Sequence, residues 1–543
     1  TPDEPGTAVP KEATGASLPP WLTWRGTPWI AAGVLLLVVI ATGWVSDDAY
    51  VNLRSVGLAW EGYGPVYNVD ERVQAFTHPL WFGVLFLAFG LTWGEAWWAA
   101  FLSSVFYTGL ALAAVVVAFR RQPLQAILAI GLLACSRSFI EYGSSGLENP
   151  MTFALLAGIV AAREERGRRL TEAGSLGVVS VLAGFALVNR LDTLLLVGPF
   201  WAASVWDARG IGGWRLTRAV LLGLVPLAAW EAFSVVYYGV PVPNTAYAKL
   251  GAGMPVGVKV RMGLTYLTHF VIHDPVGALV LFWALVGGLL RGGSKARPAL
   301  ASMALYVAYI AWIGGDFMAG RFLAAPVLLA ALTVASLPSS KARSPRTVLI
   351  AVIGLAVVGQ VVWTLHPQRR GQEAALVAKG PYEATRLFGI VDERTYFRST
   401  LGLAAVLWNG GTPARITRTE GEAVAARAEA QGRPVVAMPA QAGVYGYYAG
   451  KDVFIVDLYG LGDPLIARLP MTVGPTRQWA PGHFPRSYPE GYLEGRARRE
   501  NTIADPDLHA FYDELDQVVA GPLLSGARWS SLWRLNTGAL DPR

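Results

Sequence analysis

Residues 28–50 read PWIAAGVLLLVVIATGWVSDDAY, an uncharged apolar run that ends on two adjacent carboxylates. The run from Pro28 to Val45 is about as long as the ~17 to 25 residues that cross a bilayer as a helix. It therefore predicts a first membrane span, with Asp47 and Asp48 at a membrane face. A carboxylate at such a face can accept a proton from a hydroxyl group, bind a cation, or mark where the helix re-enters water. The pair alone leaves all three interpretations open.

The rest of the chain repeats this apolar character. Of its 543 residues, 53% are hydrophobic and only 15% are charged, and the mean hydropathy is +0.39. Apolar runs alternate with short Arg-rich loops, which indicates a polytopic α-helical membrane protein, because lipid accepts only helices or closed barrels. The net charge of +7 lies mainly in those loops, so it indicates topology, and no nucleic-acid partner is expected. The single cysteine, Cys135, excludes an intramolecular disulfide and a cysteine-rich zinc site.

Basic clusters orient the spans, because cytoplasmic loops carry an excess of Lys and Arg. The clusters at 120–121, 163–169, 209–218, 291–297 and 341–346 are placed in the cytoplasm. About eleven transmembrane helices then cross the plasma membrane, with polar segments between them on the outer side. The expected spans are 28–45, 97–118, 123–140, 149–163, 175–189, 193–206, 219–238, 274–290, 298–313, 322–338 and 347–366.

Three regions are expected along the chain. Residues 1–27 are interpreted as a disordered cytoplasmic tail, 28–366 as the membrane domain with a long first outer loop at 46–96, and 367–543 as a soluble domain outside the cytoplasm. Within the first outer loop, the apolar run 79–90 is too short to cross the bilayer. We expect that run to lie on the outer face as an interfacial helix.

The soluble region is predicted to be an α/β module. Pro434–Met438 and Val453–Asp457 are short apolar runs typical of buried strands, and Gly421–Gly432 is rich in Ala and Glu, which is typical of a helix. We expect this module to lie beside the polar outer loops.

Polar and charged residues gather in the segments that this topology places outside. The segments are Asp47-Asp48-Ala49-Tyr50, Thr77-His78-Pro79, Gly146-Leu147-Glu148, Asn189-Arg190-Leu191-Asp192, Pro243-Asn244-Thr245 with Lys249, Gly314-Gly315-Asp316 with Arg321, Asp457-Leu458-Tyr459-Gly460-Leu461-Gly462-Asp463 and Pro481-Gly482-His483. Their order along the chain resembles the actinobacterial terminal arabinofuranosyltransferase family, which belongs to the GT-C class of membrane glycosyltransferases.

The resemblance implies a GT-C fold and a polyprenyl-phosphate donor of arabinofuranose. It also implies transfer to the terminus of a cell-wall arabinan on the outer face of the plasma membrane, with Asp47 or Asp48 as the catalytic base. The residues expected at the donor are Arg190, Asp192, Lys249, Asn244, Asp316, Arg321, Glu148 and Tyr50, and those expected at the acceptor are His78, Asp457, Asp463 and His483.

The residue types suit this chemistry independently. The donor's tail lies in the bilayer and its phosphate at the surface, so a site must straddle the interface. Arginine donates two hydrogen bonds at once to a phosphate and never loses its charge, which favours Arg190 and Arg321 as phosphate ligands. An acceptor hydroxyl needs a base, and a positioned carboxylate supplies ~10²- to 10⁴-fold in rate.

Structural alternatives stand beside each role. Arg190 with Asp192 could form an ion pair at helix ends, and Arg321 could extend its side chain to the membrane surface. Glu148 could be a charge at a helix N-terminus. Lys249 could bind lipid head groups, and His483 could be an ordinary surface histidine.

Other functions also remain open. The same chemistry fits a mannosyl or other pentosyl transferase, and a non-enzymatic alternative is a lipid-linked sugar transporter or flippase. There is no Gly-rich nucleotide loop and no His/Cys metal cluster in the sequence, although a divalent cation held by Asp47 and Asp48 stays open. The proposed enzyme requires Asp48, Arg190 and Arg321 to converge in one pocket beside an apolar slot.

Overall fold

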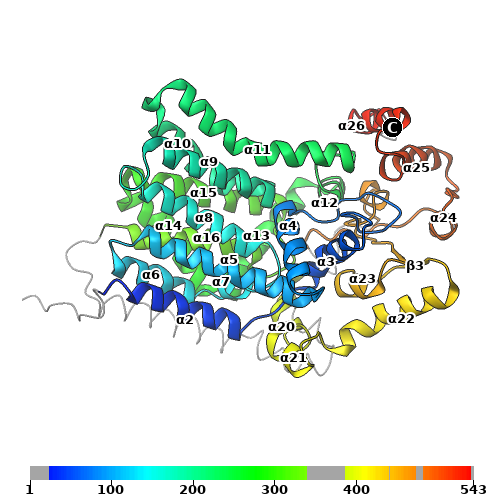
Figure 1. Ribbon diagram of the computed structural model, residues 1–543, viewed down its shortest axis with the longest axis horizontal. Helices are drawn as coiled ribbons and strands as arrows, with labels where there is room; N and C mark the ends of the chain where they lie inside the picture. Colours follow the sequence, from blue (N-terminus) through cyan, green and yellow to red (C-terminus); the bar gives the residue numbers. More distant parts are fainter. Residues whose placement is uncertain (1–23, 339–385, 440, 473–480, 540–543) are drawn as a thin grey trace, which may run out of the picture.

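The computed structural model describes residues 24–338, 386–439, 441–472 and 481–539 (Figure 1). Most of the predicted tail 1–27 and the whole of the predicted span 347–366 lie outside the described residues. The first described part is almost entirely helical. Its helices are α2 (Thr27–Ala41), α3 (Asp47–Trp60), α4 (Pro79–Leu91), α5 (Ala96–Ala118), α6 (Pro123–Ala134), α7 (Arg137–Tyr142), α8 (Asn149–Glu164), α9 (Glu172–Asn189), α10 (Leu194–Asp207), α11 (Gly213–Tyr237), α12 (Asn244–Leu250), α13 (Val256–His273), α14 (Pro275–Arg291), α15 (Gly293–Ile313) and α16 (Ala324–Ser336).

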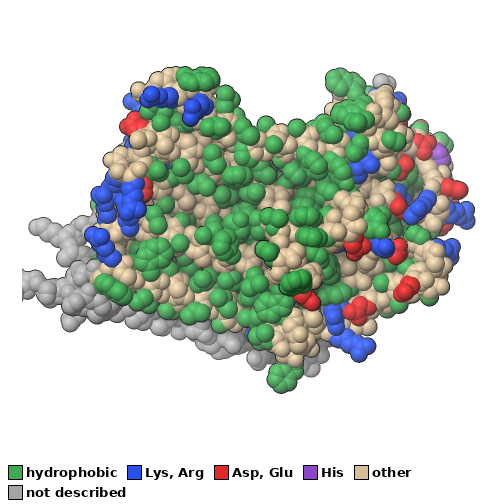
Figure 2. Space-filling view, viewed as in Figure 1, with side chains coloured by type: hydrophobic (Ala, Val, Ile, Leu, Met, Phe, Trp, Pro, Cys, Tyr) green, Lys and Arg blue, Asp and Glu red, His purple; other side chains and the backbone are tan. Residues whose placement is uncertain are grey.

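The apolar helices confirm the prediction of a helical, multi-pass membrane protein. Among the described residues, α5, α9, α11 and α15 are each long and apolar enough to cross a membrane, and α13 with α14 forms a fifth candidate bent by 112°. The helices α2, α4 and α6 and the segment Arg321–Ser336 are apolar but shorter. Figure 2 shows a broad hydrophobic face between two ends where charged side chains gather. The number of spans, about eleven, stays a prediction.

Two breaks in helices depart from the predicted spans. The expected span 123–140 is split at Ser136 into α6 and α7. The helix α13 was not predicted, because its Lys259 and Arg261 interrupt the apolar pattern. Asp274 connects both breaks: its carboxylate accepts hydrogen bonds from Ser136 Oγ at 2.6 Å and from the Gly277 backbone N–H at 2.8 Å. The second of these bonds caps the N-terminus of α14.

The later described residues form small elements around α3 and the first outer loop. They are β1 (Arg386–Leu387), β2 (Ile390–Val391), α20 (Glu393–Phe397), α21 (Leu403–Trp408), α22 (Arg415–Gln431), β3 (Val435–Ala437), α23 (Gly443–Ala449), β4 (Val453–Ile455), α24 (Tyr492–Arg498), α25 (Pro506–Val519) and α26 (Gly526–Asn536). β1 and β2 pair antiparallel, and β3 and β4 pair parallel. The two strands and the helix predicted in this region are thus present, as β3, β4 and α22.

A separate C-terminal α/β domain is not confirmed. The hydrophobic cluster around β3 and β4 also contains Tyr67 and Ala75 of the first outer loop. Ile390, Phe397 and Val444 belong to the same cluster as the membrane helices. The C-terminal segment, by which we mean the described residues from 386 to 539, therefore shares its hydrophobic clusters with residues 24–338.

Candidate functional site

A cavity of about 380 Å³ opens where the ends of several helices meet the C-terminal segment. Its walls bring together seven of the residues singled out in the sequence, namely Asp48, His78, Arg190, Asp192, Lys249, Arg321 and His483. Each lies at or near the end of a helix or in a loop, because the regular helix interiors are occupied by apolar packing. The convergence of Asp48, Arg190 and Arg321, which the sequence argument required, is present.

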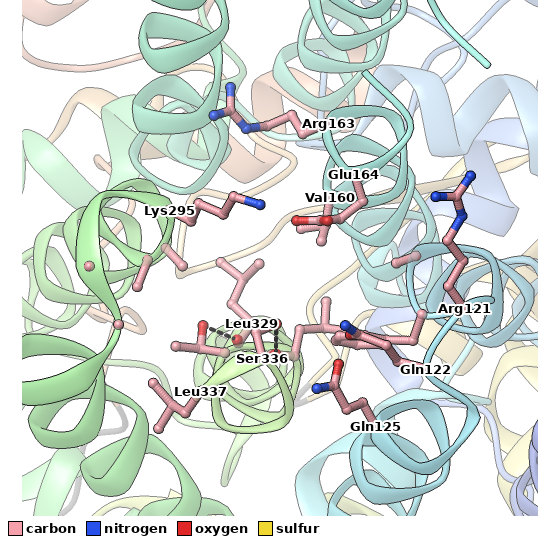
Figure 3. A pocket seen from close by; sticks show the side chains of 18 of the residues that line it. Arg121, Gln122, Gln125, Val160, Arg163, Glu164, Lys295, Leu329, Ser336 and Leu337 are labelled. Carbon is pink, nitrogen blue, oxygen red and sulfur yellow. Dashed lines mark hydrogen bonds between the residues drawn. The ribbon is translucent and has the colours of Figure 1, made fainter. Parts of the chain in front are cut away.

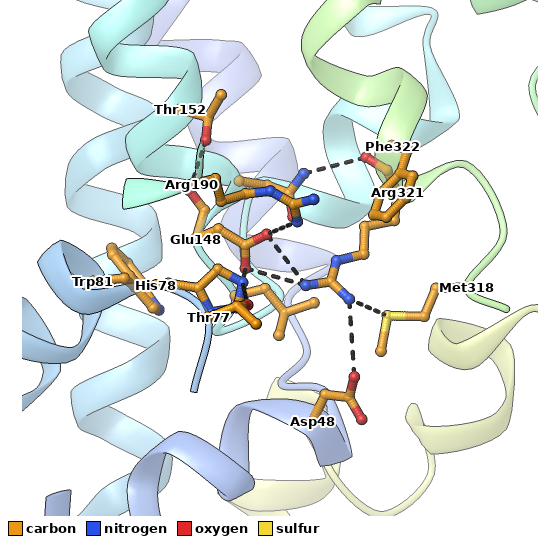
Figure 4. A network of polar contacts seen from close by, with 12 residues as sticks. Asp48, Thr77, His78, Trp81, Glu148, Thr152, Arg190, Met318, Arg321 and Phe322 are labelled. Carbon is orange, nitrogen blue, oxygen red and sulfur yellow. Dashed lines mark hydrogen bonds and ion pairs between the residues drawn. The ribbon is translucent and has the colours of Figure 1, made fainter. Parts of the chain in front are cut away.

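Glu148 lies at the centre of the charged residues (Figure 4). It is fully buried just before α8, and its carboxylate is 2.5 Å from Arg190 Nη1, 3.2 Å from Arg321 Nη2 and 3.0 Å from His78 Nε2. Burial alone would raise the pKa of Glu148, but Arg321, His78 and Arg190 hold the pKa well below its usual value. Glu148 is therefore an anion whose three neighbours are fixed in place around it.

Arg190 ends α9 and is held on two sides. Its Nε donates to Asp192 Oδ1 at 2.8 Å, while its guanidinium lies 4.9 Å from the centre of the Phe322 ring. Tyr306 donates to the other oxygen of Asp192 at 3.1 Å. The ion pair between Arg190 and Asp192, raised above as an alternative, is thus present, and it lies in the cavity wall.

Asp48 points from the first turn of α3 toward Arg321. Its nearest oxygen is 3.8 Å from Arg321 Nη1, and the Asp48 side chain is 31% exposed. Burial raises the pKa of Asp48, although the charges of Arg321 and Lys249 oppose the rise. Asp316 lies 3.6 Å from the same Arg321 nitrogen and is buried, so Arg321 connects the carboxylates of Asp48, Asp316 and Glu148.

Lys249 and His483 also line the cavity. No side-chain partner of Lys249 Nζ occurs among the described residues, and burial lowers the pKa of Lys249. The His483 ring packs edge-on against Phe317, with ring centres 4.3 Å apart. Burial first, and then the charge of Lys249, lower the pKa of His483 to about 4, so its imidazole is neutral at pH 7. His483 is therefore not an ordinary surface histidine.

Asp47 and Tyr50 do not line the cavity. The Asp47 carboxylate accepts backbone hydrogen bonds from Val444 at 2.8 Å and Gly443 at 3.2 Å, at the start of α23. Tyr50 is fully buried against Tyr447, with ring centres 5.6 Å apart. Both side chains thus fasten α3 to the C-terminal segment.

Three further predicted site residues, Asn244, Asp457 and Asp463, form hydrogen bonds within the protein and do not line the cavity. Asn244 donates to the carbonyl oxygens of Gly460 at 2.8 Å and Asp463 at 3.0 Å. Asp457 accepts from the Leu461 N–H at 2.7 Å, and Asp463 accepts from the Tyr492 hydroxyl at 2.8 Å. These residues shape the loop that carries Leu461, which is itself part of the cavity wall.

Sequence reasoning missed Glu393. This buried residue begins α20, and its carboxylate accepts a hydrogen bond from Ser46 Oγ at 2.9 Å. Burial first, and then the charge of Asp48, raise the pKa of Glu393 well above its usual value. No local pattern could have identified it, because 347 residues separate the two partners.

One side of the cavity is apolar. Its wall includes Leu187, Leu227, Trp230, Tyr309 and Ile313 from α9, α11 and α15. The charged side and the apolar side together can accommodate an amphiphile with an anionic head. Among the described residues, no group of three or more His, Cys, Asp or Glu side chains is arranged to hold a metal ion.

Comparisons with known proteins confirm the sequence resemblance. The chain is 27% identical over 421 residues to a terminal beta-(1->2)-arabinofuranosyltransferase of Mycobacterium tuberculosis, an alignment that covers 66% of this chain and 63% of that protein. It is also 27% identical over 370 residues to the enzyme of the same name from Corynebacterium glutamicum, covering 59% of this chain and 52% of that one. The chain thus spans less than two thirds of either relative. No protein-family model matches it.

Solved structures give a more distant similarity. The crystal structure of ArnT from Cupriavidus metallidurans bound to undecaprenyl phosphate aligns with a TM-score of 0.47 at 12% identity, covering 80% of this chain and 85% of that one. The apo structure of the same protein aligns with a TM-score of 0.45 at 13% identity, covering 80% and 86%.

Proposed function

We propose that this protein is a membrane glycosyltransferase of the GT-C class that moves an arabinofuranosyl group from a polyprenyl phosphate to the terminus of a cell-wall arabinan. The observation that carries the proposal is that Asp48 and Arg321 face each other in one cavity, with Lys249 and an apolar wall beside them. The names of the relatives from Mycobacterium tuberculosis and Corynebacterium glutamicum support arabinofuranose as the transferred sugar.

The donor phosphate is assigned to Arg321, Arg190 and Lys249. The two arginines share the carboxylate of Glu148, and Asp192 and Asp316 lie beside them, so these carboxylates hold both guanidinium groups in the cavity wall. Lys249 brings a further cation to the same cavity. When the glycosidic bond breaks, negative charge grows on the departing phosphate, and fixed cations in a site with little water stabilise that charge by several kcal/mol, as an order of magnitude. The apolar wall receives the first part of the polyprenyl chain.

Asp48 is assigned as the base. Its carboxylate is open to the cavity, whereas both Asp47 oxygens accept backbone hydrogen bonds. In the reaction the acceptor hydroxyl loses its proton to Asp48, its oxygen bonds to the anomeric carbon, and the bond from that carbon to the phosphate oxygen breaks. The products are the extended glycan and the polyprenyl phosphate.

The remaining cavity residues are assigned to orientation. Neutral His483 can donate one hydrogen bond and accept another, which suits sugar hydroxyl groups. His78 Nε2 is 3.0 Å from Glu148, so only the other ring nitrogen of His78 is assigned to the substrate. The proposal leaves Asp457, Asp463, Asn244 and Tyr50 out of substrate contact. It places the cavity on the outer face of the plasma membrane, since the basic loops lie at the opposite ends of the helices.

Single substitutions of the acidic pair test the proposal. We expect Asp48→Asn to lower the rate of transfer from a radiolabelled polyprenyl-phosphate arabinofuranose to an arabinan oligosaccharide by ~10²- to 10⁴-fold. Asp47→Asn is the matched control and keeps most of the transfer, because an amide oxygen still accepts from the start of α23. Equal elution volumes on size-exclusion chromatography establish that both variants fold. Full transfer by Asp48→Asn would end the proposed mechanism.

The same assay tests which sugar the protein transfers. Donors that carry mannose or another pentose on the same lipid are offered in competition, and products are separated by thin-layer chromatography. We expect the arabinofuranosyl product to dominate. A dominant mannosyl product would replace arabinofuranose in the proposal and leave the roles of Asp48 and the cations intact.

A further inference from the structure

A second cavity, of about 490 Å³, lies among the loops that join the membrane helices (Figure 3). Its walls come from the turn between α5 and α6, the end of α8, the turn between α14 and α15, and the end of α16. Arg121, Arg163 and Lys295 lie around its rim in Figure 3, and Leu329 lies deeper. None of the proposed catalytic residues takes part in it.

Two helices connect this cavity to the catalytic one. α15 begins at the second cavity with Gly293 and ends at the first with Ile313. Its 21 residues correspond to about 30 Å of helix, the thickness of the hydrocarbon core of a bilayer. α8 likewise begins beside Glu148 and ends at the second cavity with Glu164. The two cavities therefore lie at opposite membrane faces.

Cations dominate the second cavity, and some of them have no partner. Five basic side chains line it against two acidic ones. The Glu165 carboxylate accepts hydrogen bonds from Arg120 Nε at 2.7 Å and from Arg120 Nη2 at 2.6 Å. Arg163 pairs with Asp207 at 3.1 Å. Within the described ranges, the side chains of Arg121, Arg168 and Lys295 form no hydrogen bond or ion pair with another side chain. Three cations thus face one cavity without an acidic partner.

The interior of the cavity is apolar. Val160, Phe200, Leu329 and Leu332 line it between the basic loops. A small inorganic anion would leave these side chains against water, whereas the glycerol and first acyl carbons of a lipid would cover them. Burying apolar area is worth roughly 25 cal/mol per Å², so an amphiphile binds here better than a free ion.

We propose that this cavity binds the phosphate head group of an anionic membrane phospholipid, with Arg121, Arg168 and Lys295 as its ligands. Basic pockets between membrane helices on the cytoplasmic side are suited to such head groups. The inference does not rest on the proposed sugar transfer, because it uses other residues at the other membrane face. It gives the protein a lipid site that is separate from its donor site.

The experiment measures the thermal midpoint of the purified full chain in detergent with added phosphatidylglycerol, phosphatidylcholine or inorganic phosphate. We expect phosphatidylglycerol to raise the midpoint more than phosphatidylcholine does. We expect the difference to shrink in high salt, since these three cations are exposed and are screened by salt. Equal midpoints with the two lipids would overturn the proposal. Inorganic phosphate that matches phosphatidylglycerol would also overturn it, in favour of a free-anion site.

Matched variants locate the effect. The triple variant Arg121→Ala, Arg168→Ala, Lys295→Ala should lose the difference between the two lipids. The control Arg215→Ala, Arg218→Ala, Arg291→Ala removes the same charge from basic residues that do not line the cavity, and should keep the difference. If the first variant does not fold, native mass spectrometry of the unaltered protein must find retained anionic phospholipid. Its absence there, or a cavity variant that keeps the preference, would refute the assignment.

Discussion

At the scale of single residues, one buried carboxylate organises the cavity that contains Asp48, Arg190 and Arg321. Glu148 lies between two arginines and a histidine in a place where unpaired charge is costly. Removing one partner of a buried charge group typically costs ~3–5 kcal/mol, because the remaining charge is left without compensation. Glu148 therefore orients Arg190 and Arg321, the cations proposed to bind the donor phosphate. The sequence suggested a helix-terminal charge for it and could not reveal the three partners.

The adjacent carboxylates have distinct environments, and this gives a pH prediction for Asp47. Burial raises the pKa of Asp47 from 3.8 to about 6, with its backbone hydrogen bonds opposing the rise. Between those two values the folded protein holds a proton that the unfolded chain has released, so the contribution of this group to stability falls as pH rises. Asp47→Asn removes that contribution.

The test for Asp47 is the thermal midpoint of both proteins at pH 4.5 and pH 7, two values that bracket most of the titration. We expect the unaltered protein to lose more stability than Asp47→Asn when the pH is raised across this range. Identical changes in the two proteins would show that Asp47 has an ordinary pKa in the folded state.

At the scale of elements, the breaks in α6–α7 and α13–α14 are positioned by one residue. Asp274 accepts from Ser136 Oγ, from the Ser138 backbone N–H at 2.9 Å and from the Gly277 backbone N–H. The sequence gives a reason for each break separately, since Pro275 follows Asp274 and Ser136 can cap α7. That the two breaks meet could not be deduced, because Ser136 and Asp274 are 138 positions apart in the chain.

Asp274→Ala should therefore destabilise the protein more than the loss of an ordinary cap does. It leaves buried donors unsatisfied, at about 1–3 kcal/mol for such a group. The control is Asp505→Ala, which removes the exposed N-cap of α25 and should cost only ~0.5–2 kcal/mol. Thermal midpoints of the two variants in the same detergent make the comparison. A loss no larger than that of the control would contradict the linking role of Asp274.

At the scale of the whole molecule, the C-terminal segment is attached by polar contacts from α3. Buried Arg54 of α3 donates to the carbonyl oxygens of Tyr67 at 2.7 Å, Gly450 at 3.0 Å and Val453 at 2.8 Å, and also to that of Gly446. Since Asp48 lies on the same helix, this attachment also fixes Asp48, the proposed base, relative to His483.

Arg54→Ala should loosen that attachment. We expect chymotrypsin to cleave the region after residue 386 faster in this variant, because four carbonyl oxygens lose their donor. Arg433→Ala, at an exposed position in the same region, is the control and should be cleaved at the original rate. Equal rates for the two variants would show that apolar packing alone holds the segment.

The sequence by itself determined the membrane character, most helix positions, and the residues that could carry the chemistry. It could do so because the length and apolarity of a membrane-crossing helix are local properties of the chain. The tertiary structure alone decided that Asp48 faces Arg321 while Asp47 caps α23, that α13 is a helix, and that the C-terminal segment shares its cores with the first outer loop. These outcomes depend on contacts between residues that are up to about 400 positions apart in the chain. No local pattern encodes which distant side chain will be the partner of a buried charged group.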